Sequence, residues 1–446
     1  MMHHAAAPPS LPELHPTMQR WVWLPVSLIS LLWLWPVWVA PERALSIDPY
    51  WEMAQQLGAG PWPFTNFGVG FPLLLALIQT LGGSPLVAVV LQKGLTVFTA
   101  LTLAKLAHAE GVSPRVAVGA GLLFGLSPMV QVYSSVLLTE TLYLFWVILG
   151  LRATQKALAA HRAGRKSGIL LALAPWGLAG LTLGASSLTR GNGLLVIGLV
   201  IAYGGLILLK QRGAARAAGA GRSGWLKLGG LAGLALIFPL SMAWLNLGWY
   251  GTFKPTSSGD YNLGVLMIGP AMCQVEGKPV KASASIWLSD EQVAAAPNGF
   301  VLAQEVRTVA LAWAKQHPVP LVKGTLKGTV NALIGPSKAL LESLTGMRWL
   351  VGVSLTLRCL LALGVLSWGL SLLLRPHTQL LGFFVMGYVA VHILPAGAGG
   401  YARFGLPVEL LSSIGLAQVI ASGAGWFQQQ RRKKALTQSV TGKDEA

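Results

Sequence analysis

The sequence predicts an all-α fold, that of a polytopic helical membrane protein, and three observations support the prediction. Of its 446 residues, 53% are hydrophobic and only 11% are charged, whereas soluble domains carry about 25% charged residues. Apolar runs of roughly 20 residues, enough to cross a bilayer core of about 30 Å, recur along the chain. Tryptophan residues gather near the ends of these runs, where the membrane interface favours them. We therefore expect a chain that crosses a membrane many times.

Apolar runs of suitable length predict about ten transmembrane helices. A further run at 67–82 is short for a crossing, and Gly68, Gly70 and Pro72 interrupt its start, which predicts a juxtamembrane or re-entrant helix. The first long run lacks a clear cleavage pattern, so we expect it to be retained as a helix. The ten long runs lie at 21–40, 84–106, 114–133, 139–156, 168–188, 193–209, 228–249, 349–374, 377–396 and 403–424.

The positions of the basic residues predict how the helices are oriented. Clusters of Lys and Arg lie at 152–166, at 210–227 and in the tail at 431–434. Ten crossings put all three clusters and both termini on the cytoplasmic side, as the positive-inside rule requires, whereas an eleventh crossing at 67–82 would move the first two clusters outside. Topology thus accounts for the formal charge of +18, and we expect no nucleic-acid partner.

This topology divides the chain into three parts. Residues 1–249 form an N-terminal transmembrane module with a first outer loop at 41–83. Residues 250–348 form a small exoplasmic loop region, with a helix near 300–316 and an interfacial helix at 319–345. Residues 349–446 form C-terminal transmembrane helices and a basic cytoplasmic tail. Most acidic residues fall on the outer side, so we expect any acid–base chemistry there.

Several common catalytic motifs are missing from the sequence. It contains no glycine-rich phosphate loop, no zinc-type histidine pair and no Gly-x-Ser-x-Gly elbow in a suitable context. The two cysteines, Cys273 and Cys359, are too few and too far apart for a disulfide framework or a thiolate metal site. A soluble type of nucleotide enzyme is therefore not expected.

Two acidic residues are candidates for catalysis. Asp48 stands before Pro49 just after the first apolar run, where an Asp is more often a helix cap than a catalyst. Glu140 lies between two apolar runs with no other charge nearby. Ionisable residues at membrane depth usually face a cavity or a partner, although an exposed interfacial cap is the alternative for Glu140.

Basic residues at predicted helix ends are candidates for anion binding. Arg190 precedes a Gly191-Asn192-Gly193 turn that exposes it at an outer helix junction, where it would bind an anionic headgroup or extend to the interface. Arg403 offers a fork of donors that matches phosphate, and its alternative is a pair with Glu409. Lys93 and Arg358 interrupt apolar runs, and each would bind a lipid phosphate or extend outward.

Segments in order along nearly the whole of residues 45–420 carry a family resemblance. They are Asp48-Pro49-Tyr50, Gly70-Phe71-Pro72-Leu73-Leu74, the stretch from Ser127-Pro128 to Glu140-Thr141-Leu142, Leu188-Thr189-Arg190-Gly191-Asn192-Gly193, Tyr261-Asn262-Leu263 with His317-Pro318, and Arg403-Phe404-Gly405-Leu406-Pro407-Val408-Glu409. In this combination the chain resembles the polytopic bacterial glycosyltransferases of the GT-C superfamily, near glycosyltransferase family 39 and the protein mannosyltransferases. It departs from them in having one acidic residue at the core of its first loop, where many relatives have two, and Leu410 instead of a frequent proline.

The resemblance implies a multi-pass enzyme of the cytoplasmic (inner) membrane whose active site faces the periplasm or exterior. It would transfer a sugar, with inversion, from a polyprenyl-phosphate-linked donor to a lipid, glycan or protein acceptor, with membrane lipids as further partners. The catalytic residues would be Asp48, as base, and Glu140, which would orient the acceptor. The substrate-binding residues would be Tyr50, Lys93, Arg190, Arg403 and Glu409.

Three questions stay open at this stage. As an alternative role, Asp48 and Glu140 would together bind a divalent metal ion. A transporter or flippase for a lipid-linked sugar would also need basic groups near a phosphate, although transporters more often show inverted repeats and broken helices at mid-membrane. A membrane scaffold without catalysis is the third alternative.

Overall fold

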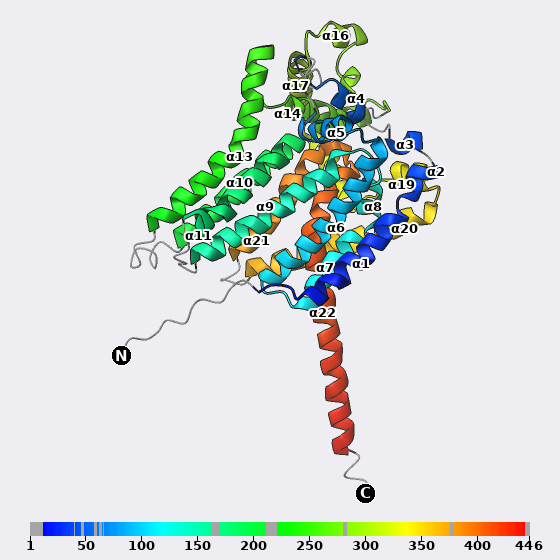
Figure 1. Cartoon of the computed structure of the whole chain (residues 1–446). Helices are drawn as coiled ribbons and strands as arrows, with labels where there is room; N and C mark the ends of the chain where they lie inside the picture. Colours follow the sequence, from blue (N-terminus) through cyan, green and yellow to red (C-terminus); the bar gives the residue numbers. More distant parts are fainter. Residues whose placement is uncertain are drawn as a thin grey trace.

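The computed structural model describes residues 12–39, 41–45, 49–57, 60–61, 65, 67–162, 169–210, 221–279, 283–374 and 379–441. Within these ranges the chain forms helices and no strand, so the predicted all-α class is confirmed. Figure 1 shows a bundle of long helices with several short helices gathered at one end. We call α4 (Tyr50–Gln55), α5 (Gly70–Thr80) and the elements from α14 (Ser258–Asn262) to α17 (Gly299–Gln316) the cap. The end of the bundle beside them is the capped end.

The long helices of the bundle account for most of the predicted crossings. They are α1 (Pro16–Leu32), α6 (Pro85–Ala109), α9 (Thr139–Arg162), α10 (Ile169–Thr189), α11 (Asn192–Lys210), α13 (Gly221–Tyr250), α20 (Arg348–Leu374), α21 (Gln379–Ile393) and α22 (Ala402–Thr441). Among the described residues, seven helical segments are long and apolar enough to cross a membrane: Pro16–Val39, Pro85–Ala109, Asn192–Lys210, Ser223–Tyr250, Arg348–Leu374, Gln379–Gly399 and Ala402–Ala424. Helices α9 and α10, with 24 and 21 residues, would each span about 30 Å or more at 1.5 Å per residue.

The predicted single helix at 114–133 is instead divided in two. Helix α7 (Pro114–Gly125) has 12 residues, and α8 (Pro128–Tyr133) begins after a break at Leu126 and Ser127. Pro128 lacks a backbone N–H and cannot continue the hydrogen bonds of α7, but it fits the first position of a new helix. The run at 67–82 forms α5 (Gly70–Thr80), whose 11 residues reach only about 16 Å, in agreement with the predicted juxtamembrane helix.

The segment at 250–348 folds into several short helices. Helix α17 lies where a helix near 300–316 was predicted, and the predicted interfacial helix is divided where Gly335-Pro336 interrupts it. Helix α16 begins with a capping box between Ser289 and Gln292, and Gly346, at φ 65°, ends α19 in a left-handed conformation that favours glycine. The elements are α14 (Ser258–Asn262), η1 (Leu263–Ile268), α15 (Gly269–Val275), η2 (Ala284–Ile286), α16 (Asp290–Ala295), α17 (Gly299–Gln316), α18 (Pro318–Ile334) and α19 (Lys338–Thr345).

The remaining short elements connect the long helices. They are α2 (Trp35–Val39), α3 (Pro41–Leu45), α4 (Tyr50–Gln55) and η3 (Leu394–Gly399). Helices α9, α10 and α13 lie side by side, α6 packs on α1 and α7, and α22 packs on α20 and α7. The C-terminal half of α22 extends away from the bundle at the end opposite the cap (Figure 1).

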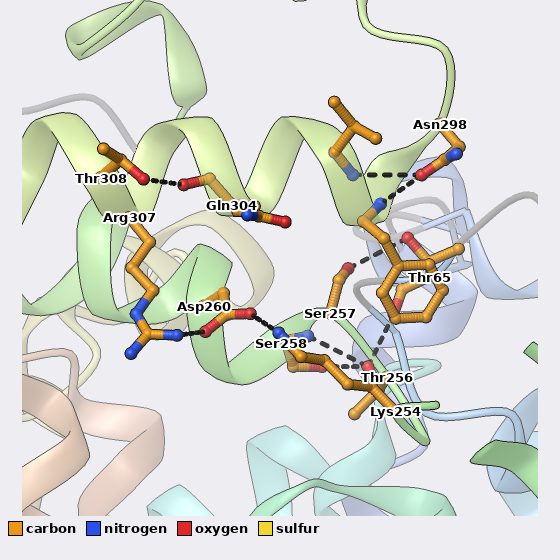
Figure 2. Close-up of polar contacts among 12 residues, drawn as sticks. Thr65, Lys254, Thr256, Ser257, Ser258, Asp260, Asn298, Gln304, Arg307 and Thr308 are labelled. Atoms are coloured by element: carbon orange, nitrogen blue, oxygen red, sulfur yellow. Dashed lines mark hydrogen bonds and ion pairs between the residues drawn. The ribbon is translucent and has the colours of Figure 1, made fainter. Parts of the chain in front are cut away.

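One residue of the 41–83 loop, Thr65, is attached to the chain segments where α14 and α17 begin. The Thr65 carbonyl oxygen accepts hydrogen bonds from the Ser257 backbone N–H and from the Thr256 hydroxyl, both at 2.7 Å. The Thr65 hydroxyl lies 3.0 Å from the Ser257 hydroxyl, as Figure 2 shows. A Cβ atom on Gly299, at the start of α17, would overlap the Thr65 side chain. The 41–83 loop is therefore in direct contact with the starts of α14 and α17.

Candidate functional site

An ion pair joins helices α9 and α10. Glu140 is the second residue of α9, and Arg190 directly follows α10. The Arg190 Nη1 atom lies 2.5 Å from the Glu140 Oε1 atom, and these side chains are 13% and 2% exposed. Because α9 and α10 pack together, residues that are fifty positions apart in sequence meet. Glu140 is thus a buried ion-pair partner and not an exposed cap, and Arg190 is mostly buried beside it.

Two aromatic rings lie beside the Arg190 guanidinium. Its Cζ atom is 5.8 Å from the centre of the Tyr143 ring and 5.7 Å from that of Phe404. The Cζ atom of Arg403, at the start of α22, is 5.8 Å from the same Phe404 ring. A desolvated cation over an aromatic face gains about 1–2 kcal/mol. We call Glu140, Tyr143, Arg190, Arg403 and Phe404 the arginine cluster.

A buried histidine that the sequence analysis did not select supports the cluster. The His392 Nδ1 atom lies 2.8 Å from the Tyr388 carbonyl oxygen, and its Nε2 atom lies 2.7 Å from the Tyr143 hydroxyl. Since a carbonyl oxygen only accepts, Nδ1 donates, and in the neutral imidazole Nε2 accepts from Tyr143. His392 is fully buried and fixes the tyrosine ring on which Arg190 lies. Its only signal in sequence was a single histidine inside an apolar run.

The first outer loop packs against the same helix junction. Tyr50, in α4, is 5% exposed, and its ring centre lies 5.5 Å from that of Phe67 and 5.3 Å from that of Phe71. A Cβ atom on Gly68 would overlap the carbonyl oxygen of Thr189, the residue before Arg190. Only glycine permits this approach, so the loop and Arg190 are held close together. Asp48 itself lies outside the described residues.

Lys93 takes part in a separate set of contacts. Its ammonium group is buried and lies 2.7 Å from the Gln131 carbonyl oxygen, 2.9 Å from the Ser134 hydroxyl and 2.8 Å from the Ser135 hydroxyl. An ammonium group has three N–H donors, and these three oxygen atoms suffice to accept them. The ammonium group of Lys93 is therefore satisfied by contacts within the protein, and its predicted contact with a lipid phosphate is not needed to balance its donors.

Glu409 pairs with Arg358 and lies in a second buried polar group. The Arg358 Nε atom lies 3.2 Å from the Glu409 Oε1 atom, within ion-pair range but without hydrogen-bond alignment. The Ser127 hydroxyl donates to Glu409 Oε2 at 2.7 Å. The sequence alternative of an Arg403–Glu409 pair is not the arrangement found, and Arg358, 1% exposed, neither reaches the interface nor lies open to lipid.

Arg358 also joins three helices through backbone contacts. Its guanidinium donates to the carbonyl oxygens of Ala332, at 2.6 Å, Ala402, at 3.2 Å, and Gly335. A Cβ atom on Gly405 would overlap both this guanidinium and the Ala332 carbonyl oxygen. The glycine in the Arg403-Phe404-Gly405 sequence is thus required by close packing of α18, α20 and α22.

The described residues do not form a metal site around Glu140. No group of three or more His, Cys, Asp or Glu residues gathers anywhere in the described ranges. The Glu140 carboxylate is already neutralised by Arg190, and a cation so close would repel a divalent metal ion. Asp48, the second carboxylate of the metal alternative, lies outside the described residues, so that alternative stays a prediction.

Two solved structures are similar to this chain. The archaeal oligosaccharyltransferase AglB from Archaeoglobus fulgidus, in complex with an inhibitory peptide and a dolichol-phosphate, aligns with 15% identity and a TM-score of 0.46 over 94% of this chain and 52% of the AglB chain. ArnT from Cupriavidus metallidurans, bound to undecaprenyl phosphate, aligns with 15% identity and a TM-score of 0.40 over 92% of this chain and 80% of the ArnT chain.

These similarities concern the helical fold alone. The chain spans about half the length of AglB. No protein-family profile and no curated protein sequence matches it.

Proposed function

We propose that this protein is a membrane glycosyltransferase that transfers a sugar from a polyprenyl-phosphate-linked donor to a lipid, glycan or protein acceptor. The arginine cluster carries the proposal, because arginines from two separate parts of the chain lie over one ring, Phe404. An arginine presents a planar fork of N–H donors that matches phosphate oxygens. The cluster is suited to hold the donor phosphate while the polyprenyl chain of the carrier stays in the membrane.

The ion pair prepares Arg190 for this role. Glu140 engages one nitrogen of the guanidinium and so fixes the direction of the remaining N–H groups. Donors that are oriented in advance stabilise negative charge as it develops on the departing phosphate. In this proposal Arg190 and Arg403 are substrate-binding residues, and Glu140 positions Arg190. Tyr50, Lys93 and Glu409 instead support the surrounding structure through their contacts.

Asp48 is the proposed general base. It directly precedes Pro49 and Tyr50, and Tyr50 packs on the ring of Phe71 near the Arg190 junction. The acceptor hydroxyl oxygen would attack the anomeric carbon as the bond to the phosphate oxygen breaks. The proton passes to Asp48, and the phosphate leaves with the bonding electrons, so the anomeric configuration inverts.

The lipid carriers held by the two similar proteins, a dolichol-phosphate and undecaprenyl phosphate, are the first donors to test. Purified protein in lipid nanodiscs would be incubated with a radiolabelled sugar on undecaprenyl phosphate and candidate acceptors. We expect labelled acceptor and free carrier phosphate. In proteoliposomes, movement of the labelled donor across the bilayer without any product would instead identify a flippase.

We further propose that the capped end faces the periplasm or exterior and that the opposite end faces the cytoplasm. Single cysteines would be placed at two exposed residues, Glu291 in the cap and Lys156 in α9, after removal of Cys273 and Cys359. In intact cells, a membrane-impermeant maleimide should label position 291, and it should label position 156 only after permeabilisation. Labelling of position 156 in intact cells would reverse the orientation and remove the proposed site from the outer face.

Replacement of Arg403 by lysine tests phosphate binding, because lysine keeps the charge but loses the planar fork. A hydrogen bond to a charged group is worth about 1.5–3 kcal/mol, so we expect Arg403→Lys to weaken binding of undecaprenyl phosphate by about tenfold or more. Arg190→Lys should have a similar effect. Scintillation proximity binding in nanodiscs would measure both.

Arg348 supplies the matched control for this experiment, since it is an exposed arginine at the start of α20. Arg348→Lys should bind the carrier with normal affinity. If all three variants bind like the unsubstituted protein, the phosphate does not lie in the arginine cluster.

A further inference from the structure

An open groove runs along the exposed face of α17 in the cap. Its volume is about 640 Å³, within the roughly 300–1,000 Å³ of common ligand sites. Figure 2 shows Asp260 between Arg307 and Lys254, with contacts to both. The polar side chains that line the groove are Lys254, Gln304, Arg307, Thr308, Lys315 and Gln316.

Asp260 holds two of the groove cations in fixed positions. The Lys254 Nζ atom lies 2.6 Å from Asp260 Oδ2, and the Arg307 Nη1 atom lies 3.0 Å from Asp260 Oδ1. The Asp260 side chain is only 18% exposed, whereas those of Lys254 and Arg307 are 44% and 46% exposed. The carboxylate is therefore beneath the cations, which keep part of their surface in the groove. Cations that are already ordered lose less entropy when a ligand binds.

The groove has a surplus of positive charge. Three cationic side chains, Lys254, Arg307 and Lys315, line it, and Asp260 is the carboxylate that pairs with two of them. The formal surplus is two positive charges. Surface potentials of this kind attract and orient anionic ligands, so charge complementarity selects an anionic occupant.

The pattern of side chains along α17 fits an extended saccharide. Gln304, Thr308 and Gln316 alternate with the cations along this face, and their amide and hydroxyl groups can both donate to and accept from sugar hydroxyls. From Gln304 to Gln316 the helix rises about 18 Å. A single small anion would use only a fraction of this length.

We propose that this groove docks an acidic saccharide, one that carries carboxylate or phosphate groups. We assign this saccharide as the acceptor of the transferred sugar, and this assignment rests on the proposed function. Lys254 is followed by Thr256 and Ser257, which hydrogen bond to Thr65 in the first outer loop. A saccharide in the groove would therefore lie beside the loop that carries the proposed base.

The test uses the full chain in nanodiscs of phosphatidylcholine, which has no net charge. Fluorescent oligogalacturonate supplies carboxylates, phosphorylated dextran supplies phosphates, and unmodified dextran is the neutral reference. We expect both acidic saccharides to bind at least fivefold more tightly than dextran, with affinity that falls as salt is raised. The double variant Arg307→Gln/Lys315→Gln should lose at least fivefold in affinity for both.

A second double variant, Lys323→Gln/Lys327→Gln, removes the same charge from exposed positions of α18 outside the groove. We expect less than a twofold change in its saccharide binding. Equal loss in the two double variants would overturn the proposal, because overall charge would then explain the binding. It would also be overturned if phosphatidylglycerol nanodiscs abolished saccharide binding to the unsubstituted protein, since lipid headgroups would then be the occupant.

The groove and the arginine cluster can be tested separately. Arg190→Lys should leave saccharide binding unchanged, and the groove variant should keep normal affinity for undecaprenyl phosphate. In sugar transfer, the groove variant should raise the acceptor KM at least fivefold with kcat maintained. Normal saccharide binding without any sugar transfer would contradict the proposed function alone. Sugar transfer in which the groove variant has an unchanged acceptor KM would contradict only the assignment of the groove as the acceptor site.

Discussion

Replacement of Asp48 by asparagine is expected to lower the rate of sugar transfer by about a hundredfold to ten-thousandfold, the usual effect of losing a general base. Asparagine caps a helix nearly as well as aspartate, so the fold should be retained. Affinity for the polyprenyl-phosphate donor should also be retained, because the proposed phosphate contacts come from Arg190 and Arg403. Single-turnover transfer and donor binding, measured on the same preparation, would separate these effects.

Glu52 provides the control for this substitution. It is an exposed carboxylate in α4, four residues after Asp48, and Glu52→Gln removes the same charge from the first loop. We expect this variant to transfer sugar at close to the normal rate. A well-folded Asp48→Asn protein with near-normal transfer would exclude Asp48 as the base and direct attention to Glu140.

Replacement of Arg358 by methionine is expected to cause the largest loss of stability. The substitution leaves the Glu409 carboxylate, 3% exposed, without its cation, and it removes the donors to the carbonyl oxygens of Ala332 and Ala402. Removal of one partner of a buried ion pair typically lowers the free energy of unfolding by about 3–5 kcal/mol. Unfolding of the detergent-solubilised protein by heat and by SDS would measure this loss.

The double variant Arg358→Met/Glu409→Leu shows whether the buried charge is the cause. Hydrophobic residues of similar volume often replace a complete buried pair at little cost, so this variant should recover much of the stability lost in Arg358→Met. Glu409→Leu alone should be strongly destabilised as well. If the two single losses simply add in the double variant, the side chains do not interact energetically.

The helices were predictable because their signals are local and strong. Apolar length alone identifies α6, α11, α13 and α20, and the missing N–H of Pro128 explains why one expected helix became α7 and α8. Arg190 and Arg403 were selected from sequence because each stands at a predicted outer helix end, and their role in phosphate binding stays a prediction. The structure then brought them to one ring, Phe404, which no spacing in the sequence could indicate.

The pairing of buried charges could not be predicted from the sequence. Glu409 lies six residues from Arg403 and fifty-one from Arg358, and a nearer partner is the natural first choice. The observed pair depends on how α20 and α22 are rotated against each other, and Gly405 leaves room for the Arg358 guanidinium beside α22. Lys93 illustrates the same limit, because its oxygen partners in and after α8 are defined only by tertiary structure.

We expect the attachment at Thr65 to link the two proposed ligand sites thermodynamically. An anion that immobilises Lys254 would also order Thr256 and Ser257, and their hydrogen bonds would pass that order to Thr65. By reciprocity, a donor that orders the first loop must strengthen anion binding in the groove by the same factor. The three hydrogen bonds at Thr65 are the physical connection through which such cooperativity between donor and acceptor would act.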